Sequence, residues 1–418
     1  MQRSRLVGVL AAITAAVVVV LVGPDLDDEP KPLPARLLVE APGAGAPPVF
    51  TEPGTHAIAE LAAPDHGPDD VEVCGVGWVT PQADGAIGDG VLRTPELLGA
   101  RRRIVESLAA DSEPFARAAA LWLGGTTESD VDLRRVSVAH APPDRVVDER
   151  AAQSNRDALA RLALGTDDPR LYGLAYRHCT PAPYAGWCAS LNASRWAQLD
   201  AGNAMPWLFI LDEATRRKER AAQDEALFRM SRATRFDDRT FAIPGLISAH
   251  AGTSDAQAAA ALQLSIEAIG LSAAQSAPLQ HVSQACRGRP LDDANRRQVC
   301  ADVAESMTGR TDSVLLRMIG IGIGRSVGWP AERLDALRGE ASAWIAAAAE
   351  VEAFPESLGC AAVGRLNRRM VRQGVIGELE GLRELLASNG GSTEPFVNAE
   401  RERRLQAAAG PAASTATP

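Results

Sequence analysis

The fold is decided by a pattern that occurs twice: Leu108-Ala-Ala-Asp-Ser-Glu-Pro114-Phe-Ala-Arg-Ala-Ala-Ala-Leu121 and Leu162-Ala-Leu-Gly-Thr-Asp-Asp-Pro169-Arg-Leu-Tyr-Gly-Leu-Ala175. In both stretches an apolar helical run ends, an acidic turn follows, and a proline opens a new apolar run. Stacked helical hairpins are built from such units. A looser third copy surrounds Pro206, and the unequal intervals between the three prolines indicate an irregular stack without a fixed period.

Helix signals continue along most of the chain. Thr94-Pro95-Glu96 supplies an N-cap hydroxyl, a first-turn proline and an acidic residue. Alanine-rich runs such as 341–349 favour helix, because alanine loses no side-chain entropy on ordering. Val71–Thr80, with β-branched alternation, is the best single strand candidate. We therefore predict an all-α, α-solenoid-like fold, with further helices at 114–123, 146–164, 169–178, 219–234, 254–273, 276–286, 293–308, 311–327, 330–353, 356–373 and 375–388.

The amino terminus predicts a single membrane span. Residues 6–23 contain no charge and would reach roughly 27 Å as a helix, close to the thickness of the hydrocarbon core. Arg3 and Arg5 precede the run and acidic residues follow it, which places the bulk of the chain in the periplasm and the anchor in the inner membrane. A cleaved signal peptide is the alternative, but its small-x-small candidate, 14–16, lies inside the apolar run.

Composition divides the chain into five regions. Residues 1–23 form the anchor or signal segment, and the Pro/Gly-rich residues 24–70 read as a flexible linker that lacks apolar periodicity. Residues 71–240 form an N-terminal helical-hairpin region, 241–409 form a C-terminal helical region, and 410–418 form a disordered tail.

Six cysteines, an even number that suits an oxidising compartment, agree with export: Cys74, Cys179, Cys188, Cys286, Cys300 and Cys360. Cys179 and Cys188 bracket a Pro-rich connection that a short disulfide would close, and Cys286 and Cys300 could face each other across a helical hairpin. Cys74 is then left to pair with Cys360. Fifteen pairings are open and this choice rests on proximity. A metal site at His178, Cys179 and Cys188 is the alternative, although the spacing lacks the close cysteine pairs of structural zinc sites.

No cofactor or metal motif is predicted. Gly320-Ile-Gly-Ile-Gly-Arg-Ser-Val-Gly328 departs from the G-x-G-x-x-G spacing and follows a helical pattern, so we interpret it as close helix packing against small residues. The histidines include no pair at i, i+4 on one helix that could chelate a metal.

The acidic side chains give weak catalytic candidates only. Adjacent pairs such as Asp167-Asp168, Asp237-Asp238 and Asp292-Asp293 are interpreted as helix caps and solvated turns. A hydrolase cutting envelope glycan needs carboxyls from separate elements that face one bond. Glu305 and Glu356 are the least implausible candidates, and neither lies in a recognisable motif.

Partner-binding candidates come from aromatic and basic residues. If Trp122 and Trp207 line a groove, they would anchor a partner; core packing is the alternative for each. Arg216 and Arg217 belong to basic clusters that could meet acidic partners or lipid headgroups. Since 53 acidic residues outnumber 43 basic ones, general nucleic-acid binding is disfavoured.

Residues 203–234 resemble a tetratricopeptide helix pair. Trp207 opens the first helix, a basic turn follows at 216–218, and a second helix runs through Phe228. Asp224 replaces the small residue that the motif requires there, and no proline ends the second helix. The combination of anchor, spacer and these segments also resembles a group of uncharacterised exported bacterial proteins.

The sequence thus favours a membrane-anchored, exported helical scaffold that binds a protein or peptide partner, with residues 6–23 in the bilayer. Two alternatives stay open. One is a periplasmic hydrolase acting on cell-envelope polymer, which would need a deep cleft holding a carboxyl with a raised pKa. The other is a structural or assembly factor without a ligand.

Overall fold

The structure, a computed structural model, describes residues 67, 69–82, 93–127, 149–180, 186–275, 278–351 and 358–409. The expected anchor, the tail and nearly all of the expected linker lie outside these ranges. None of the helices in the described ranges is long and apolar enough to cross a membrane.

The described residues form an all-α fold of sixteen α-helices with one small two-stranded sheet. The helices are α2 (Pro95–Ala109), α3 (Pro114–Thr127), α4 (Glu149–Leu164), α5 (Pro169–Cys179), α6 (Ala193–Leu199), α7 (Met205–Arg216), α8 (Arg220–Arg232), α9 (Ala242–Ala249), α10 (Asp255–Ala274), α11 (Leu279–Ala285), α12 (Ala294–Gly309), α13 (Val314–Ser326), α14 (Ala331–Val351), α15 (Cys360–Ile376), α16 (Glu378–Ser388) and α17 (Glu394–Ala409). Two 3₁₀ turns, η3 (Gly186–Ser190) and η4 (Arg289–Asp292), complete the order.

Most helices begin where the capping signals predict. The Thr94 hydroxyl accepts from the Leu97 N–H at 3.3 Å, and the Asp168 carboxylate accepts from the Arg170 N–H at 2.8 Å. Three helices, α6, α9 and α17, were not expected. No side chain caps the first turn of α9, and alternating acidic and basic residues fill the middle of α17, so α9 lacks a start signal and α17 lacks a continuous apolar stripe.

The single strand expected over residues 71–80 is wrong. These residues fold into a hairpin of β1 (Val71–Val73) and β2 (Gly77–Val79), with Val71 opposite Val79. Gly75 and Gly77 adopt φ values of +77° and +105°, which disfavour other residues. These two glycines let the chain reverse where the apolar alternation alone predicts one continuous strand.

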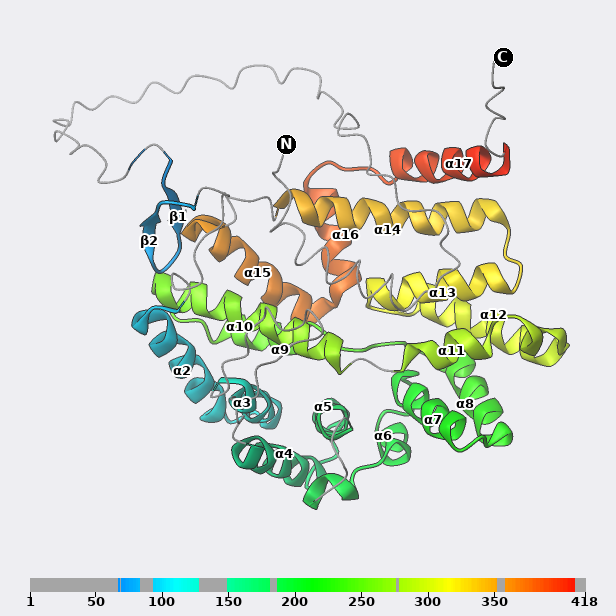
Figure 1. The fold of residues 1–418 in the computed structure, drawn as a ribbon, viewed down its shortest axis with the longest axis horizontal. Coiled ribbons are helices and arrows are strands. Elements are labelled where there is room, and N and C mark those ends of the chain that lie inside the picture. Colours follow the sequence, from blue (N-terminus) through cyan, green and yellow to red (C-terminus); the bar gives the residue numbers. More distant parts are fainter. Residues whose placement is uncertain are drawn as a thin grey trace, which may run out of the picture.

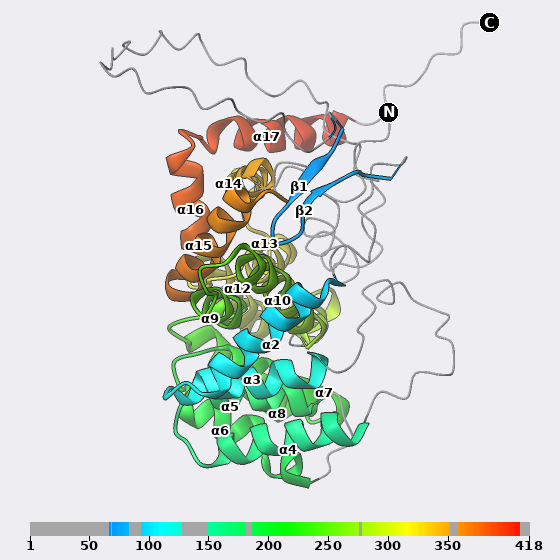
Figure 2. The ribbon, with the colours of Figure 1, turned by 90° about the vertical axis from the view of Figure 1, so that its left-hand side faces the viewer.

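The helices are piled from α4 and α6 at one end to α17 at the other (Figures 1 and 2). Many sequential neighbours pack together, for example α7 with α8 and α12 with α13. In addition, α10 packs on α2, and both α9 and α10 pack on α15. Because each repeat of a linear solenoid contacts only its neighbours, these distant contacts make the array more compact than a linear solenoid.

One hydrophobic cluster joins most of the stack. It extends from Ala100 to Ile323 and therefore crosses residue 240, where composition separates the two helical regions. Glycines allow the closest helix approaches: a Cβ on Gly245 of α9 would lie 2.8 Å from the Gly374 Cα of α15. A Cβ on Gly320 of α13 would lie 2.7 Å from the Met307 Cβ of α12. Gly320 therefore serves helix packing, as interpreted for the whole glycine run, whereas a Cβ on Gly322 or Gly328 would meet nothing within 4 Å.

Candidate functional site

Four loops lie side by side along the stack. The Thr234 and Arg235 N–H groups donate to the Gly202 carbonyl at 3.0 and 3.1 Å. Further along, the Phe236 N–H donates to the Arg310 carbonyl at 2.8 Å, and the Leu379 N–H donates to the Asp312 carbonyl at 3.1 Å. Loops from four separate helix pairs are thereby joined through backbone hydrogen bonds, which brings their polar side chains together.

Four acidic residues, here called the carboxyl cluster, gather along these loops: Asp237, Asp238, Asp312 and Glu378. Burial raises the pKa of Glu378 to about 7, although its carboxylate accepts from the Val314 N–H at 2.9 Å. Burial and then the charges of Asp238 and Asp237 raise the pKa of Asp312 to about 10. Asp312 is therefore protonated at neutral pH and donates a hydrogen bond to the Asp237 carboxylate.

Arginines offset the rest of this charge. Arg177 lies against Asp238, donating to its backbone carbonyl at 3.4 Å, and burial lowers the pKa of Arg177 while raising that of Asp238. Asp200, 2% exposed, forms ion pairs with Arg235 and, at 3.5 Å, with Arg239. Arg239 also has a positive φ of 54°, a strained conformation for a residue with a side chain.

The space beside the carboxyl cluster is small. A cavity of about 20 Å³ is lined by residues that include Trp196, Asp200, Asp237, Asp238 and Arg239. This volume accommodates about one water molecule. The cluster has the raised pKa values of an acid–base site, but a sugar ring or a peptide would not fit beside it.

A second polar region opens to solvent. Its cavity of about 480 Å³, here called the Trp344 groove, has a size typical of small-ligand sites. The groove lies between α14, α16 and the loop before α17, and its lining residues are Glu340, Trp344, Arg383, Leu386, Ala387, Gly391, Ser392 and Thr393. The two regions differ chiefly in access.

Charges of both signs surround an apolar floor in the groove. Trp344, 3% exposed, packs with Leu379 and Leu382 in a small core. The Arg383 guanidinium lies 5.2 Å from the Trp344 ring centroid, half exposed, and the Glu340 side chain remains 39% exposed while paired with Arg317. A bound chain could therefore meet a cation, an anion and an apolar surface within one groove.

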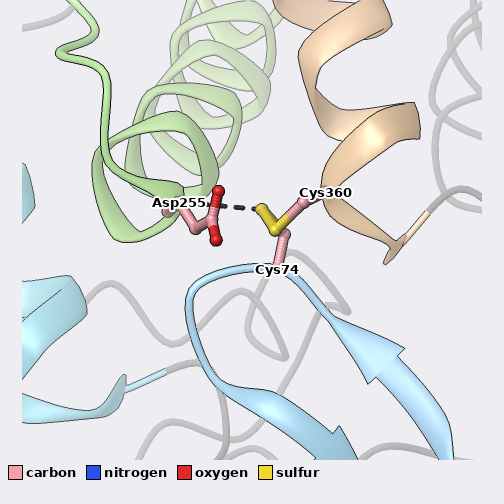
Figure 3. Close-up of side chains that lie close together, drawn as sticks. All are labelled: Cys74, Asp255 and Cys360. Atoms are coloured by element: carbon pink, nitrogen blue, oxygen red, sulfur yellow. Dashed lines mark hydrogen bonds between the residues drawn. A yellow bond between two sulfur atoms is a disulfide. The ribbon is translucent and has the colours of Figure 1, made fainter. Parts of the chain in front are cut away.

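The three disulfides join the pairs favoured by proximity in the sequence: Cys74–Cys360, Cys179–Cys188 and Cys286–Cys300. In the described part of the chain, only the Cys74–Cys360 pair belongs to a group of three side chains whose potential metal ligands lie within 4.8 Å of one another. The third member is Asp255 (Figure 3). As a disulfide, the two sulfurs are not available as thiolate ligands.

The predicted partner-binding residues are not brought together. Trp122 is 1% exposed and donates from Nε1 to Gln275 at 3.2 Å. The hypothesis that Trp122 anchors a partner is therefore wrong, because the side chain fills the core. Trp207 lies half-buried in the first turn of α7, with Arg229 over its ring at 5.7 Å. Arg216 and Arg217 remain exposed beside Asp212 and Glu213 on the same helix.

The weak catalytic and metal candidates find ordinary structural roles. Glu305 is exposed and paired with Arg333 at 2.6 Å, and Glu356 lies outside the described residues. His178 accepts at Nδ1 from Gln275, and burial, then the charge of Arg156, lowers its pKa to about 4. Since Cys179 and Cys188 are joined, the metal alternative at His178 is wrong.

The Asp237–Asp238 pair differs from its interpretation as a cap in a solvated turn. Asp168 and Asp293 cap helices as expected, and Asp237 and Asp238 do accept backbone N–H groups of the turn that they open. The turn is only partly exposed, however, because it packs against Asp312 and Arg177. The one sequence signal for a buried site here was the Asp-Asp-Arg string directly after the buried Phe236. Nothing in the sequence indicated that Asp312 and Arg177 would lie beside it.

Comparison with protein-family models, with curated proteins and with solved structures finds no match to this chain.

Proposed function

We propose that the protein is a membrane-anchored, exported scaffold whose irregular, solenoid-like stack of helices binds a peptide segment of a protein partner in the Trp344 groove. The observation that carries this proposal is the groove itself, which has about 480 Å³ of open space. Its floor is apolar, and its rim holds exposed charges of both signs. This combination suits a short chain segment better than a purely apolar ligand.

The contacts in the groove suggest what the partner presents. Arg383 offers a planar, partly exposed guanidinium that fits a carboxylate. The exposed edge of Glu340 suits a basic group, and Leu386 and Ala387 offer apolar contact beside them. We therefore expect a segment that carries an acidic residue close to an apolar one.

The hydrolase alternative is less well supported. It needs a cleft that brings polymer to a carboxyl with a raised pKa. The carboxyl cluster has such groups, but the cavity beside it holds about 20 Å³. The purely structural alternative predicts that no partner occupies the groove, and the experiment below separates it from the scaffold.

The test is site-specific photo-crosslinking of the full-length protein in native membranes. A photoreactive residue replaces Ser392 in the groove or, as a matched control, Ser112, an exposed serine in the turn between α2 and α3. We expect one protein partner to crosslink at position 392 and not at 112, with the contact peptide identified by mass spectrometry.

A pair of arginine variants sharpens the test. Arg383→Glu should abolish the crosslink, whereas Arg372→Glu should keep it. Both arginines are about half exposed and paired with a glutamate, Glu380 or Glu384, but only Arg383 lines the groove. Identical crosslinks from positions 392 and 112, none at 392, or equal crosslinks in the two arginine variants would each refute peptide binding in the groove.

A further inference from the structure

The Cys74–Cys360 disulfide is the most accessible of the three. The other four cysteines are 0–2% exposed, whereas Cys360 is partly exposed and the neighbouring Asp255 is exposed. A dithiol can therefore reach this bond while the other two disulfides stay shielded by the core. This bond also closes the longest loop, joining the β1–β2 hairpin to α15 across 286 residues of sequence.

Contacts other than the S–S bond hold this corner together. The Cys74 N–H donates to the Leu358 carbonyl at 2.9 Å, and the Glu72 carboxylate accepts from the Cys360 N–H at 3.4 Å. Gly75 packs so closely on α10 that an added Cβ would lie 2.7 Å from the Ala256 Cα. Because these contacts do not need the disulfide, both sulfurs would remain near Asp255 after reduction.

We propose that reduction converts this corner into a binding site for a soft divalent cation such as Zn²⁺, held by Cys74, Cys360 and Asp255 (Figure 3). A dithiol reduces the disulfide to two thiols and is itself oxidised to a disulfide. The cation then replaces the two thiol protons, which are released to solvent, and the Asp255 carboxylate supplies the third ligand.

The donor set favours zinc-like metals over calcium or magnesium. Two thiolates and one carboxylate match the ligands that Zn²⁺ and Co²⁺ accept, while Ca²⁺ and Mg²⁺ require oxygen. Cys360 and Asp255 are the first residues of α15 and α10. The positive ends of these helices stabilise the negative charges of a thiolate and a carboxylate. Three protein ligands leave a fourth tetrahedral position for water.

The experiment uses the full-length protein in mild detergent and Co²⁺ as the probe. Limited reduction by a phosphine, followed by alkylation and mass spectrometry, should modify Cys74 and Cys360 before the other four cysteines. Titration of the reduced protein should then give one bound Co²⁺ per chain with cobalt–thiolate absorption. Protein with all three disulfides intact should give no such absorption.

Two variants test the ligands. Asp255→Asn should weaken Co²⁺ binding by more than about tenfold, whereas Asp302→Asn, a partly exposed aspartate on α12, should leave it unchanged. Zn²⁺ should also slow alkylation of Cys74 and Cys360 in the reduced wild-type protein, a measurement that does not require a cysteine variant to fold. Simultaneous reduction of all three disulfides, absence of thiolate absorption, or equal Co²⁺ affinity in the Asp255→Asn protein would overturn the proposal.

Discussion

The carboxyl cluster and the Trp344 groove contain similar side chains and have opposite access to solvent. Both combine arginines and acidic residues with packed aromatic rings. In the carboxyl cluster the charges face one another across joined loops, beside a cavity of about 20 Å³. In the groove they lie on the rim of about 480 Å³ of open space. Residue type alone therefore does not identify a binding site, because burial decides whether charged side chains pair with each other or stay available to a ligand.

The floor of the Trp344 groove is part of a packed core, so loss of its tryptophan should have the largest effect on stability. Trp344→Ala should lower the free energy of unfolding by about 3–5 kcal/mol, because it removes a buried ring that packs with Leu379 and Leu382. Urea unfolding followed by circular dichroism measures this. Trp187→Ala, at a tryptophan that is 50% exposed, is the control and should cost less than about 1 kcal/mol. Equal costs would mean that the floor is not packed.

The next prediction addresses the ion pairs beside the carboxyl cluster. Asp200→Ala should lower the free energy of unfolding by about 3 kcal/mol, since it removes a buried carboxylate that pairs with Arg235 and Arg239 and accepts from the Asn203 amide. Asp224→Ala removes the partner of Arg296 at an exposed position and should cost less than about 1 kcal/mol. A cost below 1 kcal/mol for Asp200→Ala would show that water already solvates the loops.

The carboxyl cluster should also make stability depend on pH. The pKa of Glu378 rises from 4.5 in the unfolded chain to about 7 in the fold. Its contribution is therefore fully present below pH 4.5 and is lost as pH rises to 7, a change of up to about 3 kcal/mol. Urea unfolding of the wild-type and Glu378→Gln proteins from pH 4.5 to 8 should show this decline as a difference between the two curves, because Asp312 and His178 titrate equally in both. The same pH dependence in both proteins would contradict the burial of this carboxyl.

The smallest effect is expected at the rim of the groove. Arg383→Glu and Arg372→Glu should each change the free energy of unfolding by about 1 kcal/mol or less, because both side chains are about half exposed. Thermal unfolding of the two variants measures this. A large loss for Arg383→Glu alone would show that its contact with Trp344 is structural, and the arginine would then not be available to a partner.

Local sequence was sufficient for most of the secondary structure. Thr94 and Asp168 predict helix starts because their side chains reach the next backbone N–H groups without help from distant residues. The hairpin at 71–79 and α9 were not predicted. In the hairpin the conformations of two glycines override the apolar alternation, and α9 has no capping side chain.

The candidate sites were much less predictable. Asp238 and Asp312 are 74 residues apart, and a hydrogen bond between them follows only when two loops become neighbours. Trp344 and Arg383 come from different helices. In the sequence, Trp122 and Trp344 each lie in an alanine-rich helix and cannot be told apart. Only the packing of the helices shows that Trp122 fills the core whereas Trp344 lines the groove.

The sequence by itself determined the all-α class, most of the helix boundaries and the cysteine proximities, because helix capping, alanine-rich composition and short separations are local properties. The tertiary structure decided which acidic residues share a proton, which tryptophan borders open space and which disulfide lies next to Asp255. Those outcomes depend on burial and on electrostatic contacts between distant segments, and both exist only once the helices have packed.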